Sequence, residues 1–323
     1  MTGSTGYVGS RLVGELHRGG HEVVAVGRSL DKLHATDWPG DVERVEMDVH
    51  DPDSCRRALD AAGDVDVLYY LVHSVGGDDF AERDVESARA VAEAAAGAGV
   101  GRIVYLGGLV PRGEELSEHL GSRADVGDAL TASGVDTVWL RASIIIGAGS
   151  TSYEFVRQLV DRLRVVPLPR WMKGDVQPIA VCDVLSYLVA AAADVPPGAY
   201  DIAGPDTMGY DELVRTYADV AGLRRTFVPV RGVTPGMAAP IVARLTDVPT
   251  EMVDDLVRSM ENSMTADDDA IRRSVAPDLT SVADALRESL ATPVDRLGSY
   301  ATTQPLHLSA ADPAWAAPTA PAA

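Results

Sequence analysis

Three glycines near the start of the chain have the spacing of a loop that can bind a polyphosphate. Gly3, Gly6 and Gly9 form the pattern Gly-x-x-Gly-x-x-Gly. Glycine permits the tight turn, lets a pyrophosphate approach the main chain, and allows a helix to pack closely on a strand. Glycine loops also form ordinary turns, so the pattern indicates dinucleotide binding only where a helix follows it. The predicted contacts come from Gly3, Ser4, Thr5, Gly6, Tyr7, Val8 and Gly9, with hydroxyl donors from Ser4 and Thr5.

A basic residue occupies the place where NAD and NADP are usually distinguished. The apolar run 21–27 is typical of a strand, and Arg28 follows it. Enzymes specific for NAD usually carry an acidic residue at this strand end, whereas an arginine suits the 2′-phosphate of NADP. The sequence therefore favours NADP over NAD, and an ordinary solvated arginine is the alternative interpretation.

The next strand end should lie beside the adenine. The run 42–47 is expected to be a strand, followed by Asp48 and Val49. Asp48 could accept a hydrogen bond from the exocyclic amine of the adenine, and a plain turn aspartate explains it equally well. We therefore include Asp48 and Val49 among the predicted cofactor contacts.

A buried strand over 65–74 should end at the nicotinamide side of the crevice. Alternation along this strand sends Tyr69 and Tyr70 to opposite faces, so only one of them is expected to reach the site. His73 is a candidate proton donor, although a plain strand-end histidine is an equal alternative. The predicted lining residues are Tyr69, Tyr70, Leu71, Val72, His73 and Ser74.

The elements that position these residues alternate between strand and helix. A helix follows the glycine loop and stops at Gly19-Gly20, and helices over 78–98 and 114–132 separate strands over 65–74, 102–106 and 135–141. Apolar strands alternating with helices predict a Rossmann-type, doubly wound parallel sheet.

A strand normally precedes the glycine loop, and here only Met1 and Thr2 do so. We expect that the start was assigned too late, because losing about four buried side chains costs roughly 6–12 kcal/mol.

The rest of the chain predicts a smaller substrate-binding part. We expect a dinucleotide-binding domain over 1–150 with 178–203 returning to it, a subdomain over 151–177 and 204–295, and a flexible tail over 296–323. The tail is rich in alanine and proline and has little to bury. Arg141, Trp171 and Gln177 are candidates for the substrate pocket, and each has an equally plausible structural role.

Charge and composition exclude several classes of partner. The 323 residues carry a formal net charge of −20, which disfavours nucleic acid and anionic membrane surfaces. No apolar run is long enough to span a bilayer, and there is no basic, apolar leader. Cys55 and Cys182 are isolated, which predicts no metal site and favours a reducing cytoplasm. The expected ligands are the cofactor and a small-molecule substrate.

With these motifs in order, the chain resembles the short-chain dehydrogenase/reductase superfamily, in its atypical NmrA-like and epimerase-like branch. The resemblance covers Thr2 to about Leu290. Four further stretches carry it: 103–109, 140–147, 177–184 and 200–205.

The resemblance also implies catalytic positions, and the chain departs from them. Relatives carry a serine or threonine after the fifth strand and Tyr-x-x-x-Lys on the next helix. Here Gly107 or Gly108 takes the serine position, and His119 and Arg123 align with the tyrosine and the lysine. Arg123 could hold the ribose but cannot deprotonate, and its charge would lower the pKa of a neighbouring imidazole. His119 could donate a proton, and an exposed helix histidine is the alternative. Gly107 is also a predicted cofactor contact.

Two functions follow from this pattern. The first is an NADPH-dependent reductase of a small carbonyl or quinone-like substrate, with His119, Arg123 and His73 as the candidate catalytic residues. The second is a protein that senses NADP(H), or assembles with partners, without turnover. An epimerase that uses the cofactor transiently is disfavoured, because the acid/base pair is absent.

Overall fold

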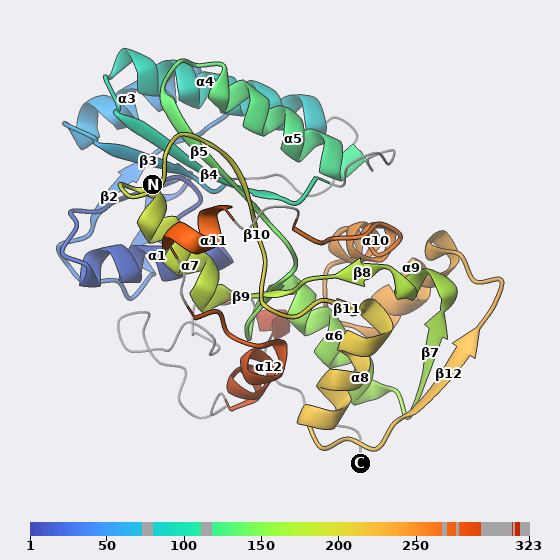
Figure 1. Cartoon of the computed structure of the whole chain (residues 1–323). Coiled ribbons are helices and arrows are strands. Elements are labelled where there is room, and N and C mark those ends of the chain that lie inside the picture. The colour runs from blue at the N-terminus through green and yellow to red at the C-terminus, as the bar shows by residue number, and fades with distance from the viewer. Residues whose placement is uncertain are drawn as a thin grey trace.

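The computed structural model describes residues 1–72, 80–110, 118–266, 270–275, 278–291, 312 and 314–316. Its first half alternates helix and strand, and the helices cover both faces of the sheet (Figure 1). The elements are α1 (Tyr7–Arg18), β1 (Val24–Gly27), α2 (Leu30–His34), β2 (Glu43–Glu46), α3 (Pro52–Ala62), β3 (Val67–Tyr70), α4 (Phe80–Gly97), β4 (Arg102–Gly108), α5 (Glu118–Thr131) and β5 (Asp136–Ala142).

The second half builds most of the smaller lobe and returns one helix and one strand to the sheet. Its elements are β6 (Ile145–Ile146), α6 (Thr151–Arg162), β7 (Val165–Pro169), η1 (Arg170–Lys173), β8 (Asp175–Val176), β9 (Ile179–Ala180), α7 (Val181–Ala191), β10 (Gly198–Ile202), β11 (Met208–Gly209), α8 (Tyr210–Val220), β12 (Thr226–Val230), α9 (Pro235–Leu245), α10 (Thr250–Ser259), α11 (Ala270–Val275), α12 (Val282–Leu290) and η2 (Ala314–Ala316).

The strands have the order of a doubly wound nucleotide-binding sheet. β2 pairs with β1, and β3, β4, β5 and β10 form a second ladder, all parallel. Met1 and Thr2 lie between the two ladders, so the order across the sheet is β2, β1, Met1–Thr2, β3, β4, β5, β10. In sheets of this order ligands bind where the winding reverses, next to the central strand. The predicted Rossmann-type fold is confirmed.

Met1 and Thr2 pair with both neighbouring strands. The Met1 amino nitrogen donates to the Val24 carbonyl at 2.6 Å, and the Met1 carbonyl accepts from Val26 N at 3.0 Å. On the other side, Thr2 N donates to the Tyr69 carbonyl at 2.9 Å. Next to them, between β1 and β3, lies a cavity of about 740 Å³, lined by apolar residues such as Val23 and Leu68 and by acidic residues such as Asp64.

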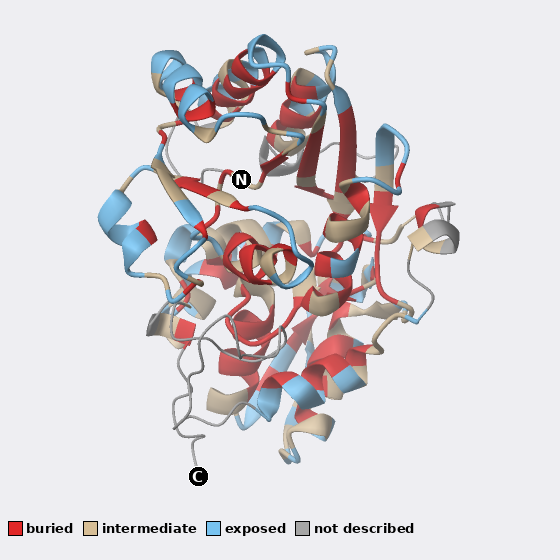
Figure 2. Ribbon diagram, turned by 90° about the vertical axis from the view of Figure 1, so that its left-hand side faces the viewer, coloured by how far each residue is buried: buried red, intermediate tan, exposed pale blue. Residues whose placement is uncertain are grey.

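Helices bury the two faces of the sheet in separate cores. On one face α1 and α7 contribute Leu12, Val13 and Leu188, and on the other α4 and α5 contribute Val91 and Leu130. Figure 2 shows the buried strands between the helices, whose outer faces are exposed. The apolar runs of the strands are therefore explained by burial on both sides. None of the helices in the described segments has the length and apolar character needed to cross a bilayer.

Short strands of the smaller lobe are absent from the sequence-based prediction. β7 and β12 pair in parallel, with Val166 opposite Phe227. β7 carries Pro167 and Pro169, which disfavour a strand in the middle of a sheet. The pair has only two strands, so these prolines lie in edge strands, where a missing N–H is tolerated. The division into two subdomains stays a prediction.

Part of the predicted flexible tail is in fact anchored. Asp312 forms a buried, two-pronged ion pair with Arg11 of α1, with distances of 2.6 and 2.8 Å. The Trp315 carbonyl accepts from Gln158 of α6 at 2.8 Å. Flexibility is therefore wrong for Asp312 and 314–316, because two polar side chains of the body hold them. The other residues of the predicted tail, 296–311, 313 and 317–323, lie outside the described residues.

The tail anchor gives a stability prediction. Asp312→Ala leaves the Arg11 guanidinium buried without its carboxylate, so we expect a loss of about 3–5 kcal/mol in the free energy of urea unfolding. Asp254→Ala removes one partner of the exposed Arg258–Asp254 pair and should cost less than about 1 kcal/mol. Equal losses for the two variants would contradict the assignment.

Candidate functional site

The glycine loop is locked by contacts between main-chain segments. Gly3 has a φ of +64°, and a Cβ there would lie 2.5 Å from the Leu71 carbonyl oxygen. A Cβ on Gly9 would lie 2.2 Å from the carbonyl oxygen of Gly3. Both positions therefore require glycine for packing alone. Gly6 is different, because it is exposed and its Cβ would lie at 3.2 Å from the nearest atom.

The N-terminus of α1 offers donors to an anion. Gly6 is the N-cap and provides no side-chain cap, and the first turn contains no acidic residue. The first N–H groups of a helix have no partner within the helix, and its dipole favours negative charge there. Because this helix follows a loop at the point where the sheet winding reverses, a pyrophosphate fits the exposed end of α1.

Of the three polar side chains in the loop, Thr5 is available to a ligand, whereas Ser4 and Tyr7 contact other parts of the protein. Thr5 is exposed. The Ser4 hydroxyl is buried and donates to the Val26 carbonyl at 2.8 Å, so its predicted role as a hydroxyl donor is wrong. The Tyr7 ring lies 4.0 Å from the Arg11 guanidinium and packs towards Gly147. Ser4 and Tyr7 can therefore serve a ligand through their main chain.

The adenosine side of the site lies at the ends of β1 and β2. Arg28 directly follows β1 and is exposed, so its guanidinium can reach an external phosphate. Asp48 is half-buried, and its Oδ1 accepts from His50 N at 3.1 Å. One carboxylate oxygen thus closes the turn, which leaves the other as the predicted acceptor for adenine. Val49 is buried in the core and can contribute only main-chain atoms.

The end of β3 does not present its tyrosines to the crevice. Tyr69 and Tyr70 do face opposite sides, as alternation predicts, but both are buried. The Tyr69 hydroxyl donates to the Leu188 carbonyl at 3.1 Å, and burial raises the pKa of both phenols. The prediction that one tyrosine reaches the site is therefore wrong. Leu71 and Val72 are half-buried beside the loop, and His73 and Ser74 lie outside the described residues.

A tryptophan explains why glycine replaces the expected serine on β4. A Cβ on Gly107 would lie 2.7 Å from Trp139 Nε1, and one on Gly127 would lie 2.6 Å from the same indole. Trp139 packs at 5.9 Å from the ring of Tyr105. The indole therefore fills the space that a side chain at position 107 would need. Sequence reasoning missed Trp139, because nothing local connects it to two glycines on other elements.

Arg123, the predicted contact of the ribose, has a buried side-chain nitrogen. It lies on α5, and its Nε is buried without a hydrogen-bond partner in the described part of the chain. Burial lowers the pKa of the guanidinium, partly offset by the nearby Tyr105, Asp255 and Asp84. A buried, unsatisfied donor at a ligand crevice suits a ribose hydroxyl. His119 lies in the first turn of α5, and its side chain is outside the described part.

The three candidates for the substrate pocket have structural partners. Arg141 pairs with Asp201 at 2.6 Å across the β5–β10 ladder. Trp171 Nε1 donates to the Val233 carbonyl at 2.9 Å. Gln177 donates to the Gly204 carbonyl at 2.8 Å and accepts from Ala266 N at 3.1 Å. Their assignment to a substrate pocket is therefore replaced by roles in holding the fold.

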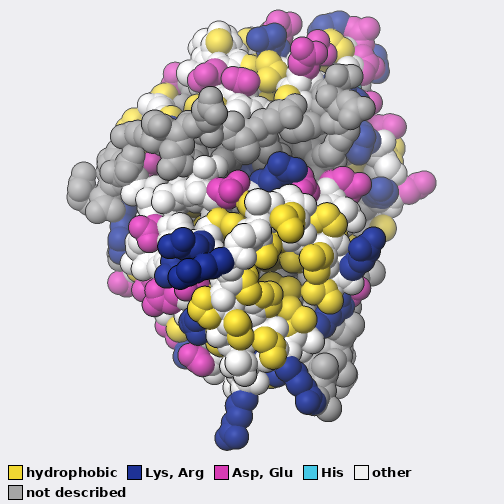
Figure 3. Space-filling view, turned by 90° about the vertical axis from the view of Figure 1, so that its right-hand side faces the viewer, with side chains coloured by type: hydrophobic (Ala, Val, Ile, Leu, Met, Phe, Trp, Pro, Cys, Tyr) yellow, Lys and Arg dark blue, Asp and Glu magenta, His cyan; other side chains and the backbone are white. Residues whose placement is uncertain are grey.

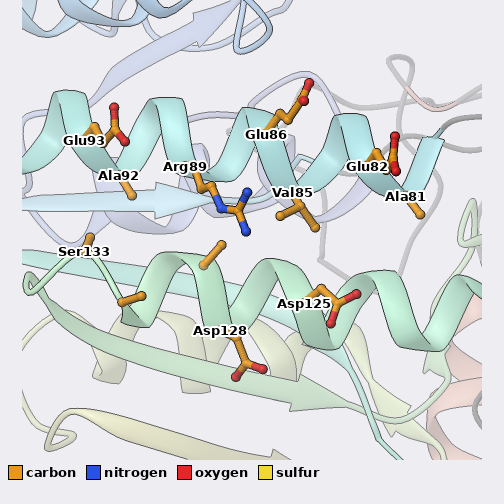
Figure 4. Close-up of a pocket in the computed structure, with 12 residues that line it drawn as sticks. Ala81, Glu82, Val85, Glu86, Arg89, Ala92, Glu93, Asp125, Asp128 and Ser133 are labelled. Carbon is orange, nitrogen blue, oxygen red and sulfur yellow. The ribbon is translucent and has the colours of Figure 1, made fainter.

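A groove of about 970 Å³ between α4 and α5 is a poor site for a dinucleotide (Figure 4). Five acidic side chains line it with a single arginine, Arg89, so it repels a polyphosphate. The acidic residues are Glu82, Glu86, Glu93, Asp125 and Asp128. The glycine loop is therefore the better site, and no group of side chains in the described residues has the composition of a metal centre.

Substitutions at Gly9 and Gly6 should have different effects, the first on folding and the second on nucleotide binding. Gly9→Ala should unfold the protein or lower its thermal midpoint strongly, because a backbone carbonyl occupies the space of the new methyl group. Gly6→Ala should keep the fold and weaken nucleotide binding at least tenfold, because the methyl group covers the exposed end of α1. Circular dichroism and calorimetry with NADPH measure the two effects. A Gly6→Ala protein that binds normally would show that no phosphate lies on this loop.

Two curated relatives match parts of the chain. The mitochondrial NADH dehydrogenase [ubiquinone] 1 alpha subcomplex subunit 9 of Mus musculus is 26% identical over 235 residues, covering 70% of this chain and 61% of the relative. The chloroplastic divinyl chlorophyllide a 8-vinyl-reductase of Zea mays is 33% identical over 118 residues, 34% of this chain and 29% of the relative. The chain thus spans less than two thirds of the length of either relative.

Solved structures share the fold over nearly the whole chain. A nucleoside-diphosphate-sugar epimerase from Staphylococcus aureus has a TM-score of 0.71 at 16% identity, covering 88% of this chain and 98% of its own. The triphenylmethane reductase of Citrobacter sp., in complex with NADP(H), has a TM-score of 0.68 at 17% identity, covering 89% and 98%. A family described as NAD(P)H-binding matches residues 3–159. This part of the chain therefore matches an NAD(P)H-binding family, and the chain has the Rossmann-type fold of the reductase and epimerase structures.

Proposed function

We propose that the protein is an NADPH-dependent reductase of the NmrA-like type, acting on a small carbonyl or quinone-like substrate. The observation that carries the preference for NADPH is Arg28, which is exposed directly after β1 with no acidic residue among 27–29. A fixed positive charge there favours the extra phosphate of NADP over the bare ribose of NAD. Two free cysteines support a reducing cytoplasm as its location.

The chain's own groups would bind and orient the cofactor rather than perform its chemistry. The N–H groups at the start of α1 hold the pyrophosphate, Arg28 holds the 2′-phosphate, and Arg123 donates to the ribose. NADPH supplies the hydride when it is bound. The reduced substrate also needs a proton, for which His119 and His73 remain the proposed donors, because the described tyrosines Tyr69 and Tyr70 are buried.

Two of the similar proteins are reductases, which supports the proposal. They are a triphenylmethane reductase and a divinyl chlorophyllide a 8-vinyl-reductase. Reduction requires a positioned acceptor next to the hydride and less acid/base machinery than epimerisation. Gly107 in the place of the catalytic serine is compatible with such chemistry.

A sensor that binds NADP(H) without turnover is the second candidate. It is favoured by Trp139, which fills the space where a serine side chain would stand at position 107. It is also favoured by the replacement of the tyrosine and lysine by His119 and Arg123. In this case the cofactor contacts are the same, and only turnover distinguishes the two functions.

The two arginines should affect binding in different ways. Arg28→Ala should weaken NADPH binding by about 10- to 100-fold and leave NADH binding unchanged, because one charge-assisted phosphate contact is lost. Arg123→Met should weaken both nucleotides alike, because the ribose next to the nicotinamide is common to them. Arg56→Ala, at an exposed arginine of α3, is the matched control and should change neither. Titration of the intrinsic fluorescence measures all three.

Turnover decides between the reductase and the sensor. NADPH oxidation should be followed through the absorption band of the reduced nicotinamide, with a panel of aldehydes, ketones and quinones. Oxidation that is abolished by Gly6→Ala supports the reductase. Tight NADPH binding without oxidation of any member of the panel would instead establish the sensor, and failure to bind either nucleotide would refute both.

A further inference from the structure

The acidic chain contains a basic region. Residues 162–174 and 220–246 contain eight of the 28 Lys and Arg residues and none of the 48 Asp and Glu residues. Six of these cations have exposed side chains. They are Arg164, Arg170, Lys173, Arg224, Arg231 and Arg244. The two segments thus carry a positive charge, although the formal net charge of the whole chain is −20.

The same two segments expose large apolar side chains. In the described residues, six large apolar side chains are exposed, and four of them lie here. Val165 is 55% exposed, Val228 39%, and Met237 and Ile241 are each 58% exposed. Single exposed apolar residues are ordinary, but four in one basic region form a patch that requires an explanation.

The two segments lie together on one face of the smaller lobe. Val165 opens β7, which pairs in parallel with β12, and Val228 lies opposite Pro167 in this ladder. Met237, Ile241 and Arg244 share one side of α9, since they are four and three residues apart. Arg162 Nη1 donates to the Leu245 carbonyl at 2.8 Å, which ties the end of α9 to the start of β7.

Figure 3 views the side of the molecule on which β7, β12 and α9 lie. It shows one hydrophobic patch with lysine and arginine side chains around its margin, and with some acidic side chains above it and to its left. We name this surface the basic-apolar face, consisting of the exposed residues of β7, β12 and α9 and the six cations given above. Its centre is aliphatic and carries no exposed aromatic ring among the described residues, so it does not offer the stacking surface that single-stranded nucleic acid requires.

We propose that the basic-apolar face docks the protein on the surface of an anionic lipid bilayer. Aliphatic side chains beside cations are the composition of interfacial elements, whose apolar atoms enter the boundary between headgroups and acyl chains. The cations then lie at the height of the anionic headgroups.

Net charge does not prevent this docking. Screening limits electrostatic interaction to about 10 Å at 0.1 M salt, so a membrane facing this surface interacts with the local positive charge. The two segments 162–174 and 220–246 contribute no acidic side chain to this local charge. The expectation from net charge, that anionic membranes repel the protein, therefore does not apply to this face.

Vesicle sedimentation with the full chain tests the proposal. At about 0.1 M salt the protein should sediment with vesicles that are half phosphatidylglycerol and half phosphatidylcholine, and not with pure phosphatidylcholine. At about 1 M salt, where the Debye length is about 3 Å, it should stay in the supernatant. Sedimentation with neither lipid, or equally with both, would overturn the proposal.

Two sets of variants locate the contact. Met237→Asp with Ile241→Asp should reduce vesicle binding at least tenfold. Leu30→Asp with Leu290→Asp has the same charge change at exposed residues of other elements, and should reduce it much less. Arg224→Gln, Arg231→Gln and Arg244→Gln together should also abolish binding, in contrast to Arg56→Gln, Arg57→Gln and Arg287→Gln.

Each variant is first checked for folding by its thermal midpoint and by NADPH binding, neither of which involves this face. Binding that survives the Met237 and Ile241 substitutions would overturn the proposal. If instead these substitutions turn a dimer into a monomer in sedimentation velocity, and the unaltered protein ignores vesicles, the face joins two copies of the chain and the membrane assignment is wrong.

Discussion

The candidate nucleotide site depends on close contacts between the main chain of the glycine loop and the main chain at the end of β3. The carbonyl of Leu71, just past β3, lies where a Cβ of Gly3 would be, and the carbonyl of Gly3 lies where a Cβ of Gly9 would be. These two contacts fix the loop between the central part of the sheet and α1. As a result the first turn of α1 is exposed at the point where the sheet winding reverses, which is where an open α/β sheet binds its ligand.

A second constraint acts on the other side of the crevice. Trp139 occupies the space between Gly107 and Gly127, so β4 ends without a side chain where relatives are expected to carry a hydroxyl. The indole is a large apolar group, and its burial contributes to the core shared by β4, β5 and α5. Position 107 cannot hold both a serine side chain and the indole of Trp139, and in this chain the indole occupies the space. Cofactor contacts on the opposite side are unaffected.

Local patterns were sufficient to predict the glycine loop, its helix and the alternation of strands with helices, because glycine spacing and apolar runs act over a few residues. The sequence could not reveal the partner of the Ser4 hydroxyl, since Val26 lies on another element. Nor could it reveal the strand at Val165–Pro169, whose prolines suggest a loop until β12 is seen beside it. His73 and His119, which the predicted chemistry needs most, lie where the structure gives no side-chain geometry.

The ion pair between Arg11 and Asp312 also has a consequence for biosynthesis. Its partners are separated by 301 positions, so the contact cannot form until almost the entire polypeptide has left the ribosome. At roughly 5–20 residues per second, Asp312 is added on the order of 15–60 s after Arg11. During this interval Arg11 can contact only groups near it in the chain, such as the Tyr7 carbonyl one helical turn earlier. Closing the ion pair is therefore a late step of folding, because it joins α1 to a segment synthesised about 300 residues later.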